Sequence, residues 1–207
     1  MKKLLLFGFD RFLSYSDNPS KRIVEKLNQS TIADCKVVGA VLPVEHKTSA
    51  LIAEKRINEE KPDVIMEIAL AAGRGCITLE RVALNRYYFV DTDKIVDESL
   101  AEDGAVGYLS TLPLERIKRA LENEGIPAEY SFWADTYVSN EVFYHIMRAA
   151  SRKKIKAAGM IHLPLSAEQV IQRKLHYMVK SNMPSMQQPK LEEAVKLAIG
   201  ICIRNIK

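Results

Sequence analysis

The chain has 207 residues, which suits one domain with a substantial core or, at most, two very small domains. Hydrophobic residues make up 47% and charged residues 27%, a composition that excludes a disordered chain. The formal net charge of +4 is spread along the chain without a basic patch, which argues against a nucleic-acid-binding protein.

The first half of the chain alternates apolar runs with amphipathic stretches. Residues 3–7 form an apolar run typical of a strand that is covered on both faces. Asn18-Pro19 predicts a helix start, because Asn caps a helix and Pro at the first position loses no needed hydrogen bond, and this helix extends to about Asn28. The next expected elements are a strand over 36–42, a helix over 45–60 and a buried strand over 64–70.

In the second half, residues 77–84 alternate in polarity and predict a more exposed strand. Residues 91–108 are acidic, contain glycine and lack periodicity, so they predict a long surface loop of the kind that forms lids or subunit contacts. The remaining expected elements are a helix over 112–124, a strand over 128–132, a helix over 136–152, a strand over 158–163, and helices over 166–179 and 191–206.

These alternating elements, without a repeat or linker, predict one α/β domain over residues 1–207. We expect three layers, with a largely parallel twisted sheet and helices on both faces, as in phosphorylase/hydrolase-like folds. Reactive groups in such sheets gather at the carboxyl ends of strands and at the helix starts that follow. Glu80, Ser139 and His162 stand at such places, and an acid, a hydroxyl and a histidine can assemble a triad. A capping serine and a structural histidine are the alternatives.

Metal and cofactor chemistry finds no support in the sequence. Cys35, Cys76 and Cys202 are widely spaced and form neither a zinc motif nor a disulfide framework. The remaining histidines also lack metal-ligand spacing: they are His46 and His145, both expected on helices, and His176. The N-terminal apolar run is too short for a signal sequence or a membrane span. We therefore expect a cytoplasmic protein with no metal, no cofactor and no membrane partner.

Six short blocks follow one another in order along the chain. They are Gly8-Phe9-Asp10-Arg11-Phe12 with Asn18-Pro19-Ser20, Ala69-Leu70-Ala71-Ala72-Gly73-Arg74, Glu80-Arg81-Val82-Ala83-Leu84-Asn85, Ala134-Asp135-Thr136-Tyr137-Val138-Ser139-Asn140, Ile161-His162-Leu163-Pro164 and Met183-Pro184-Ser185-Met186. They are similar to Gly-Phe-Glu-Pro-Phe with Asn-Pro-Ser, Gly-Leu-Ala-Pro-Gly-Arg, Glu-Arg-Ile-Ala-Val-Asn, Ala-Gly-x-Tyr-x-Cys-Asn, Ile-His-Val-Pro and Pro-Pro-Ser-Met. The chain thereby resembles the pyroglutamyl peptidase I family, the pyrrolidone carboxyl peptidases.

The resemblance implies an omega peptidase that removes N-terminal pyroglutamate from peptides through an acyl-thioester. It implies that Glu80 is the orienting acid, His162 the base and position 139 the nucleophile. It also implies a homotetramer.

The resemblance further implies that Phe9 and Phe12 hold the pyroglutamyl ring and that Arg74 lies close to the site. Core packing of the two phenylalanines is the alternative, although aromatic side chains commonly line small-ligand sites. For Arg74, a purely structural role is the alternative.

Ser139 stands where the family has its nucleophilic cysteine. A thiol beside an imidazole at a helix start can be a standing thiolate, whereas a hydroxyl must lose its proton during the attack. Nearby, Asp135 replaces a glycine, Arg11 a proline and Leu13-Ser14 a Gly-Gly pair, which indicates natural divergence. We therefore expect the family activity to be weak, altered or lost. Cys76 could stand in for the missing thiol, although a small buried filler is the simpler interpretation.

The alternative function is a non-catalytic paralogue that binds a pyroglutamyl, lactam or peptide ligand. A nucleoside- or phosphate-handling enzyme is disfavoured, because the sequence has neither a Gly-x-Gly-x-x-Gly motif nor a P-loop.

Overall fold

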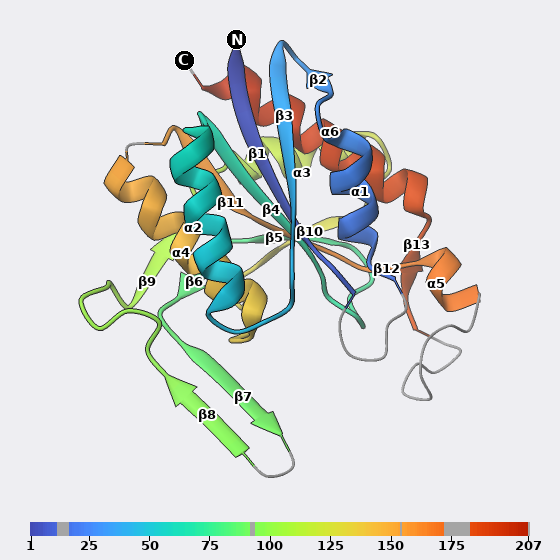
Figure 1. The fold of residues 1–207 in the computed structure, drawn as a ribbon. Helices are drawn as coiled ribbons and strands as arrows, with labels where there is room; N and C mark the ends of the chain where they lie inside the picture. Colours follow the sequence, from blue (N-terminus) through green and yellow to red (C-terminus); the bar gives the residue numbers. More distant parts are fainter. Residues whose placement is uncertain (12–16, 92–93, 154, 172–182, 207) are drawn as a thin grey trace.

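A seven-stranded sheet forms the centre of the molecule (Figure 1). The computed structural model describes residues 1–11, 17–91, 94–153, 155–171 and 183–206. The sheet has the order β10-β5-β11-β4-β1-β3-β2, and its neighbours pair in parallel except β5 with β11 and β2 with β3. Its strands are β1 (Lys2–Phe9), β2 (Thr31–Ile32), β3 (Cys35–Leu42), β4 (Val64–Leu70), β5 (Ile77–Glu80), β10 (Ala128–Ser131) and β11 (Ala157–Leu163). The expected largely parallel α/β sheet is confirmed.

Helices cover both faces of this sheet (Figure 1). The first face packs against α1 (Pro19–Leu27), α3 (Leu114–Asn123) and α6 (Gln188–Asn205), and the second against α2 (Thr48–Glu60) and α4 (Val138–Lys153). Successive residues of a strand face opposite sides, so β1 sends Leu4 into the first layer and Leu5 into the second, both fully buried. This two-sided burial explains why the strand reads as a continuous apolar run.

The close packing of α1 on β1 explains the first sequence block. A Cβ added at Gly8 would lie 2.9 Å from the backbone oxygen of Ser20, so only glycine allows the helix start to approach the strand. Asn18 caps α1 by accepting a hydrogen bond from the Ser20 N–H at 3.0 Å. The Phe9 N–H in turn donates to Ser20 Oγ at 3.0 Å. These contacts fix the carboxyl end of β1 beside the start of α1.

Two interpretations of the middle of the chain were wrong. Instead of one exposed strand over 77–84, β5 is fully buried between β10 and β11, and a separate strand, β6 (Val82–Leu84), pairs with β9 (Gly107–Leu109). Within the expected surface loop over 91–108, Lys94–Glu98 form β8, which pairs with β7 (Tyr87–Asp91) in a hairpin that projects from the body, whereas residues 99–106 are irregular as expected (Figure 1). Burial alternates along β7, where Tyr87 is buried and Tyr88 and Val90 are exposed, but these residues are all hydrophobic, so the sequence shows no period-2 pattern.

Two helices also begin or continue differently from the expectation. α2 begins at Thr48 and not at residue 45, because Lys47 has a φ of 64° that an α-helix cannot contain, so His46 lies before the helix. β12 (Leu165–Ser166), α5 (Ala167–Ile171) and β13 (Ser185–Met186) follow β11. The rest of the helix expected over 166–179, with His176, lies outside the described residues. Nowhere in the described ranges does a helix combine the length and the apolar character that crossing a bilayer requires.

Candidate active site

Four of the expected site residues line one cavity at the carboxyl edge of the sheet. Its volume is about 270 Å³, and Arg74, Ser139 and His162 line it together with Phe9. His162 comes from β11, whose residue Met160 pairs with Glu80 at the end of β5. Ser139 is the second residue of α4. The fold therefore brings together an acid, a histidine and a hydroxyl that are far apart in sequence.

Glu80 holds His162 in a fixed orientation. Glu80 Oε1 lies 2.7 Å from His162 Nδ1, and both side chains are almost completely buried. With an ionised Glu80, the ring donates from Nδ1 and keeps Nε2 available as a proton acceptor. No residue in the described part of the chain hydrogen-bonds Nε2.

Arg74 is the second partner of the same carboxylate. Its Nη1 lies 2.5 Å from Glu80 Oε1, and its Nη2 donates to the Trp133 carbonyl at 2.9 Å. Arg74 thus connects the loop after β4, the acid and the segment that precedes α4. Because Arg74 also lines the cavity, the two roles left open for it are compatible.

Burial and pairing act against each other on the two titratable partners. Burial raises the pKa of Glu80, but the hydrogen bond and charge of His162, with help from Ser131 and Arg74, outweigh it and lower the pKa overall. For His162, burial is the largest effect and lowers the pKa, and the opposing attraction of Glu80 does not overcome it. The pair therefore favours an ionised acid beside a neutral imidazole, which is the state of a general base.

Ser139 lies in the first turn of α4, where the leading N–H groups have no partner within the helix. Such groups attract negative charge and can stabilise a developing oxyanion. Within the described residues, no hydrogen bond joins Ser139 Oγ to His162, although both side chains line the cavity. A base and nucleophile that meet only when substrate binds are common in unliganded sites.

Asp135 explains one departure from the family pattern. Its φ of 67° lies in the left-handed region, which glycine adopts freely and which Asp tolerates better than most residues. Its Oδ1 accepts a hydrogen bond from the Thr136 N–H at 2.7 Å. Asp135 lines the cavity, so the departure adds a carboxylate to the site itself.

Of the two aromatic residues expected at the site, the structure describes Phe9. Phe9 is 3% exposed, packs in the core of the second layer and also lines the cavity, so its position is compatible with core packing and with a pocket role. Phe12 lies outside the described residues. Three further residues line the cavity that the sequence did not predict as site residues: Asn18, Val44 and Tyr137. Asn18 and Tyr137 stand inside the blocks of family resemblance, and that position was the available signal.

Neither a substitute thiol nor a metal cluster accompanies the cavity. Burial raises the pKa of Cys76, raises that of Cys35 to about 11 and raises that of Cys202 to about 12, so the three thiols are poor nucleophiles. None of them lines the cavity. Across the described ranges, no three His, Cys, Asp or Glu side chains are arranged to hold a metal ion.

Known proteins are similar to this chain in sequence and fold over nearly its full length. The family model for pyroglutamyl peptidase matches residues 2–205. Pyrrolidone-carboxylate peptidase from Halalkalibacterium halodurans is 40% identical over 201 residues, covering 95% of this chain and 96% of that protein. Pyrrolidone-carboxylate peptidase 1 from Saccharolobus solfataricus is 37% identical over 206 residues, covering 98% and 94%.

Solved structures agree with these sequence matches. A mutant pyrrolidone carboxyl peptidase from Pyrococcus furiosus superposes with a TM-score of 0.91 at 33% identity, covering 99% of this chain and 100% of that one. Pyrrolidone carboxyl peptidase from Thermococcus litoralis gives a TM-score of 0.91 at 32% identity, covering 99% and 94%. The chain belongs to the pyroglutamyl peptidase family.

Proposed function

We propose that this protein is a pyroglutamyl-peptidase-type hydrolase in which Ser139 is the nucleophile and turnover is weak. The observation that carries this proposal is the buried Glu80–His162 pair, which leaves one imidazole nitrogen unengaged by described residues at the cavity that Ser139 lines. A histidine held by an acid beside a hydroxyl is the arrangement that activates a serine.

The reaction follows from these positions. His162 Nε2 removes the Ser139 proton as Oγ attacks the carbonyl carbon of the N-terminal pyroglutamyl residue. Glu80 stabilises the imidazolium that forms, and the N–H groups at the start of α4 stabilise the oxyanion. Collapse of the tetrahedral intermediate breaks the C–N bond, and His162 returns the proton to the leaving amine. His162 then deprotonates a water molecule that attacks the acyl ester, and the imidazolium returns this proton to Ser139 Oγ as the ester C–O bond breaks and pyroglutamate is released.

The cavity supports a small, mostly apolar acyl group. Its volume of about 270 Å³ lies just below the usual range for small-ligand sites, and Phe9, Val44 and Leu70 supply apolar walls. A five-membered lactam presents flat apolar faces with one amide edge, which matches such walls. The preferred ligand is therefore an N-terminal pyroglutamyl peptide or a related lactam.

Two features make the turnover weak. A serine hydroxyl is far less acidic than a thiol, so the helix start and His162 cannot hold it ionised before attack. The Asp135 carboxylate lines the same cavity and opposes the negative charge that develops on the substrate oxygen. Both effects act on the transition state more than on binding.

The decisive experiment measures hydrolysis of an N-pyroglutamyl fluorogenic amide by the unaltered protein, Ser139→Cys and Ser139→Ala. We expect Ser139→Cys to raise kcat/KM at least about 100-fold, because the thiolate needs no proton transfer during attack. Ser139→Ala is expected to reduce the small activity of the unaltered protein to background. A folded Ser139→Cys variant without turnover would refute the proposed triad.

A second candidate function is ligand binding without catalysis. The Asp135 carboxylate in the cavity and the lack of a Ser139–His162 hydrogen bond within the described chain favour it. Calorimetry with pyroglutamate and 2-pyrrolidone tests this candidate. Ligand binding with no turnover above the Ser139→Ala control supports it, and measurable turnover above that control excludes it.

We also propose a homotetramer and a cytoplasmic location. Tyr88, Val90 and Ile95 on the projecting β7–β8 hairpin are exposed apolar side chains that a second copy could cover. The three cysteines are all free, as in a reducing compartment. Sedimentation velocity tests the assembly, and an Ile95→Lys variant should dissociate it if the hairpin makes the contact.

A further inference from the structure

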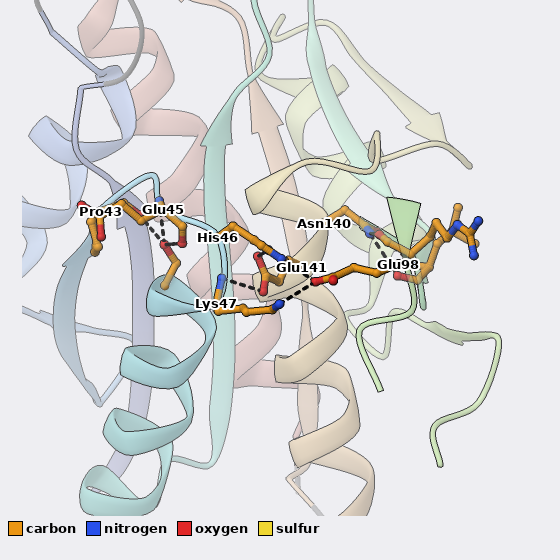
Figure 2. Close-up of polar contacts among 10 residues, drawn as sticks. Pro43, Glu45, His46, Lys47, Glu98, Asn140 and Glu141 are labelled. Atoms are coloured by element: carbon orange, nitrogen blue, oxygen red, sulfur yellow. Dashed lines mark hydrogen bonds and ion pairs between the residues drawn. The ribbon is translucent and has the colours of Figure 1, made fainter. Parts of the chain in front are cut away.

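A second polar cluster lies beside the first turn of α4, outside the catalytic cavity (Figure 2). It is centred on His46 and Lys47 before α2, Glu98 at the end of β8 and Glu141 in α4. These side chains line a cavity of about 340 Å³ that shares no lining residue with the catalytic one. The proposed reaction uses none of these residues, so their arrangement needs a separate explanation.

His46 joins two carboxylates. Its Nδ1 lies 2.9 Å from Glu141 Oε2 and its Nε2 lies 2.6 Å from Glu98 Oε1, as Figure 2 shows for their side chains. Each ring nitrogen therefore lies within hydrogen-bond distance of a different carboxyl group. Lys47 Nζ also lies 2.9 Å from Glu98 Oε1, so Glu98 contacts both His46 and Lys47. The ring also stacks on Tyr87 of β7 with centroids 3.6 Å apart.

Lys47 is held in a strained turn by the same cluster. Its φ of 64° and ψ of −45° approach a γ-turn that is rare for a side-chain-bearing residue, and the His46 carbonyl accepts a hydrogen bond from the Thr48 N–H at 2.7 Å. Glu141 Oε1 accepts a hydrogen bond from the Lys47 N–H at 3.0 Å. Strain of this kind persists only where surrounding contacts enforce it, and it concentrates near functional sites.

The cluster reaches the nucleophile through the chain itself. Glu141 is 2% exposed and stands two residues after Ser139. Between them, the fully buried Asn140 bonds the Leu84 N–H at 2.9 Å, the Leu84 carbonyl at 3.0 Å and the Arg86 carbonyl at 2.9 Å. Asn140 thus ties the turn to the segment that enters β7, and Glu141 ties it through His46 to the end of β8.

We propose that Glu141 and His46 are positioning residues for the nucleophile. The Glu141–His46–Glu98 bridge fixes the first turn of α4 against the base of the β7–β8 hairpin, and thereby sets how Ser139 faces His162. The catalytic consequence rests on the proposed function, whereas the connection between the turn and the hairpin does not.

The test uses Ser139→Cys as the parent, because the introduced thiol reports its own position through its reactivity. Iodoacetamide alkylation at residue 139 is followed by mass spectrometry from pH 5 to pH 9. His46→Phe keeps a ring to stack on Tyr87 but removes both carboxylate contacts. Glu141→Gln keeps an oxygen for the Lys47 N–H, and Glu141→Ala removes both contacts.

A matched control lies on the same helix. His145 Nδ1 bonds Glu54 Oε1 at 2.8 Å, and both residues line the second cavity, but among the described residues no side-chain hydrogen bond or ion pair joins either of them to Ser139, Asn140 or Glu141. Glu54→Gln therefore removes a histidine–carboxylate pair between α2 and α4 but leaves the proposed bridge intact. Circular dichroism of every variant establishes that it is folded.

We expect His46→Phe and Glu141→Ala to slow alkylation at pH 7 about tenfold, because a thiol displaced from the helix start and the imidazole returns towards the ordinary cysteine pKa of about 8.5 and is then mostly protonated. Glu141→Gln is expected to slow alkylation less. Combining it with His46→Phe should slow alkylation no further than His46→Phe alone, because the two residues belong to one bridge. Glu54→Gln should stay within about twofold. Equal rates in His46→Phe and Glu54→Gln would overturn the positioning role.

Amide hydrogen exchange separates this inference from the proposed function. An unactivated thiol in the Ser139→Cys parent would count against the proposed function. The bridge would still be tested by exchange at residues 139–142, which should accelerate in His46→Phe and Glu141→Ala but not in Glu54→Gln. Unchanged protection in these two variants would overturn the bridge.

Discussion

The catalytic cavity and the Glu141–His46–Glu98 bridge each contain a histidine, but the two histidines are used differently. In His162, Nδ1 binds Glu80 and no described residue bonds Nε2, whereas in His46 both ring nitrogens bind carboxylates. The His162 side chain is 4% exposed and that of His46 is 22% exposed. The number of carboxylate partners decides whether the ring can exchange a proton with a substrate.

The difference also shows what burial does in each region. Desolvation is the largest influence on His162 and lowers its pKa, so the ring stays neutral beside an ionised acid. His46 is more exposed and contacts a different carboxyl group through each ring nitrogen, and Lys47 contacts one of these groups, Glu98, as well. We therefore propose that His162, which has one carboxylate partner and lines the catalytic cavity, acts as the base, and that His46, which contacts a carboxyl group through each nitrogen, acts as a connection.

The largest expected effect comes from replacing His162, the proposed base. In the Ser139→Cys background, His162→Gln should lower kcat/KM for the pyroglutamyl amide at least about 100-fold, the usual scale of a lost general base. The control is His145→Gln, since His145 also binds a carboxylate through Nδ1 but does not line the catalytic cavity. Equal losses of kcat/KM in the two variants would mean that His162 does not act as the base.

Glu67 is a buried carboxyl group without a hydrogen-bond partner among the described residues, so it tests the cost of burial alone. Its side chain is fully buried, neither oxygen has a partner among the described residues, and burial, with the nearby Glu80 charge, raises its pKa well above the usual range. The folded state therefore retains the proton, and its stability falls as the pH rises above about 4.5, through the raised pKa. Glu67→Leu should raise the free energy of unfolding by about 1–3 kcal/mol at pH 8, and by less at pH 5.

Urea denaturation at the two pH values measures this gain. Glu67→Gln is the matched variant, because it keeps the polar shape but cannot titrate. It should show the same dependence on pH as Glu67→Leu. A Glu67→Leu protein that is less stable than the unaltered one at both pH values would mean that the carboxyl has a stabilising partner.

The lowered pKa of His162 predicts a smaller effect on stability, with the opposite dependence on pH to that of Glu67. The folded state disfavours the charged ring, so the stability due to neutral His162 is present above pH 6.5 and is lost as the pH falls below it towards the lowered pKa. NMR titration should show His162 taking up its proton below pH 6.5, with the signal assigned by its absence in His162→Gln. A midpoint above 6.5 would mean that the attraction of Glu80 exceeds the cost of burial.

The smallest effect belongs to the exposed pair. Glu54 binds His145, whose hydrogen bond lowers the pKa of Glu54, but the Glu54 side chain is 40% exposed and solvent screens the pair. Glu54→Gln should therefore cost less than about 1 kcal/mol in urea denaturation at pH 7. A larger loss would disqualify it as the control for the bridge and would show that this pair also holds α2 to α4.

Local patterns along the chain predicted much of the fold. The apolar run of β1 and the Asn18-Pro19 helix start gave correct elements, because burial on both faces and capping leave their mark in neighbouring residues. The buried β5 gave no such mark, since it becomes an interior strand only by pairing with β10 and β11, whose sequences lie about 50 and 80 residues further along the chain.

Sequence by itself determined the family, the α/β class and the candidate residues Glu80, Ser139 and His162, through short blocks whose order survives divergence. Only the tertiary structure decided how they combine: which ring nitrogen of His162 meets Glu80, that Asp135 enters the cavity, and that His46 bridges Glu98 and Glu141. The physical reason is the separation in sequence over which each interaction acts. Propensity and periodicity act over a few residues, whereas hydrogen bonds between buried side chains depend on elements that meet only after the chain has folded.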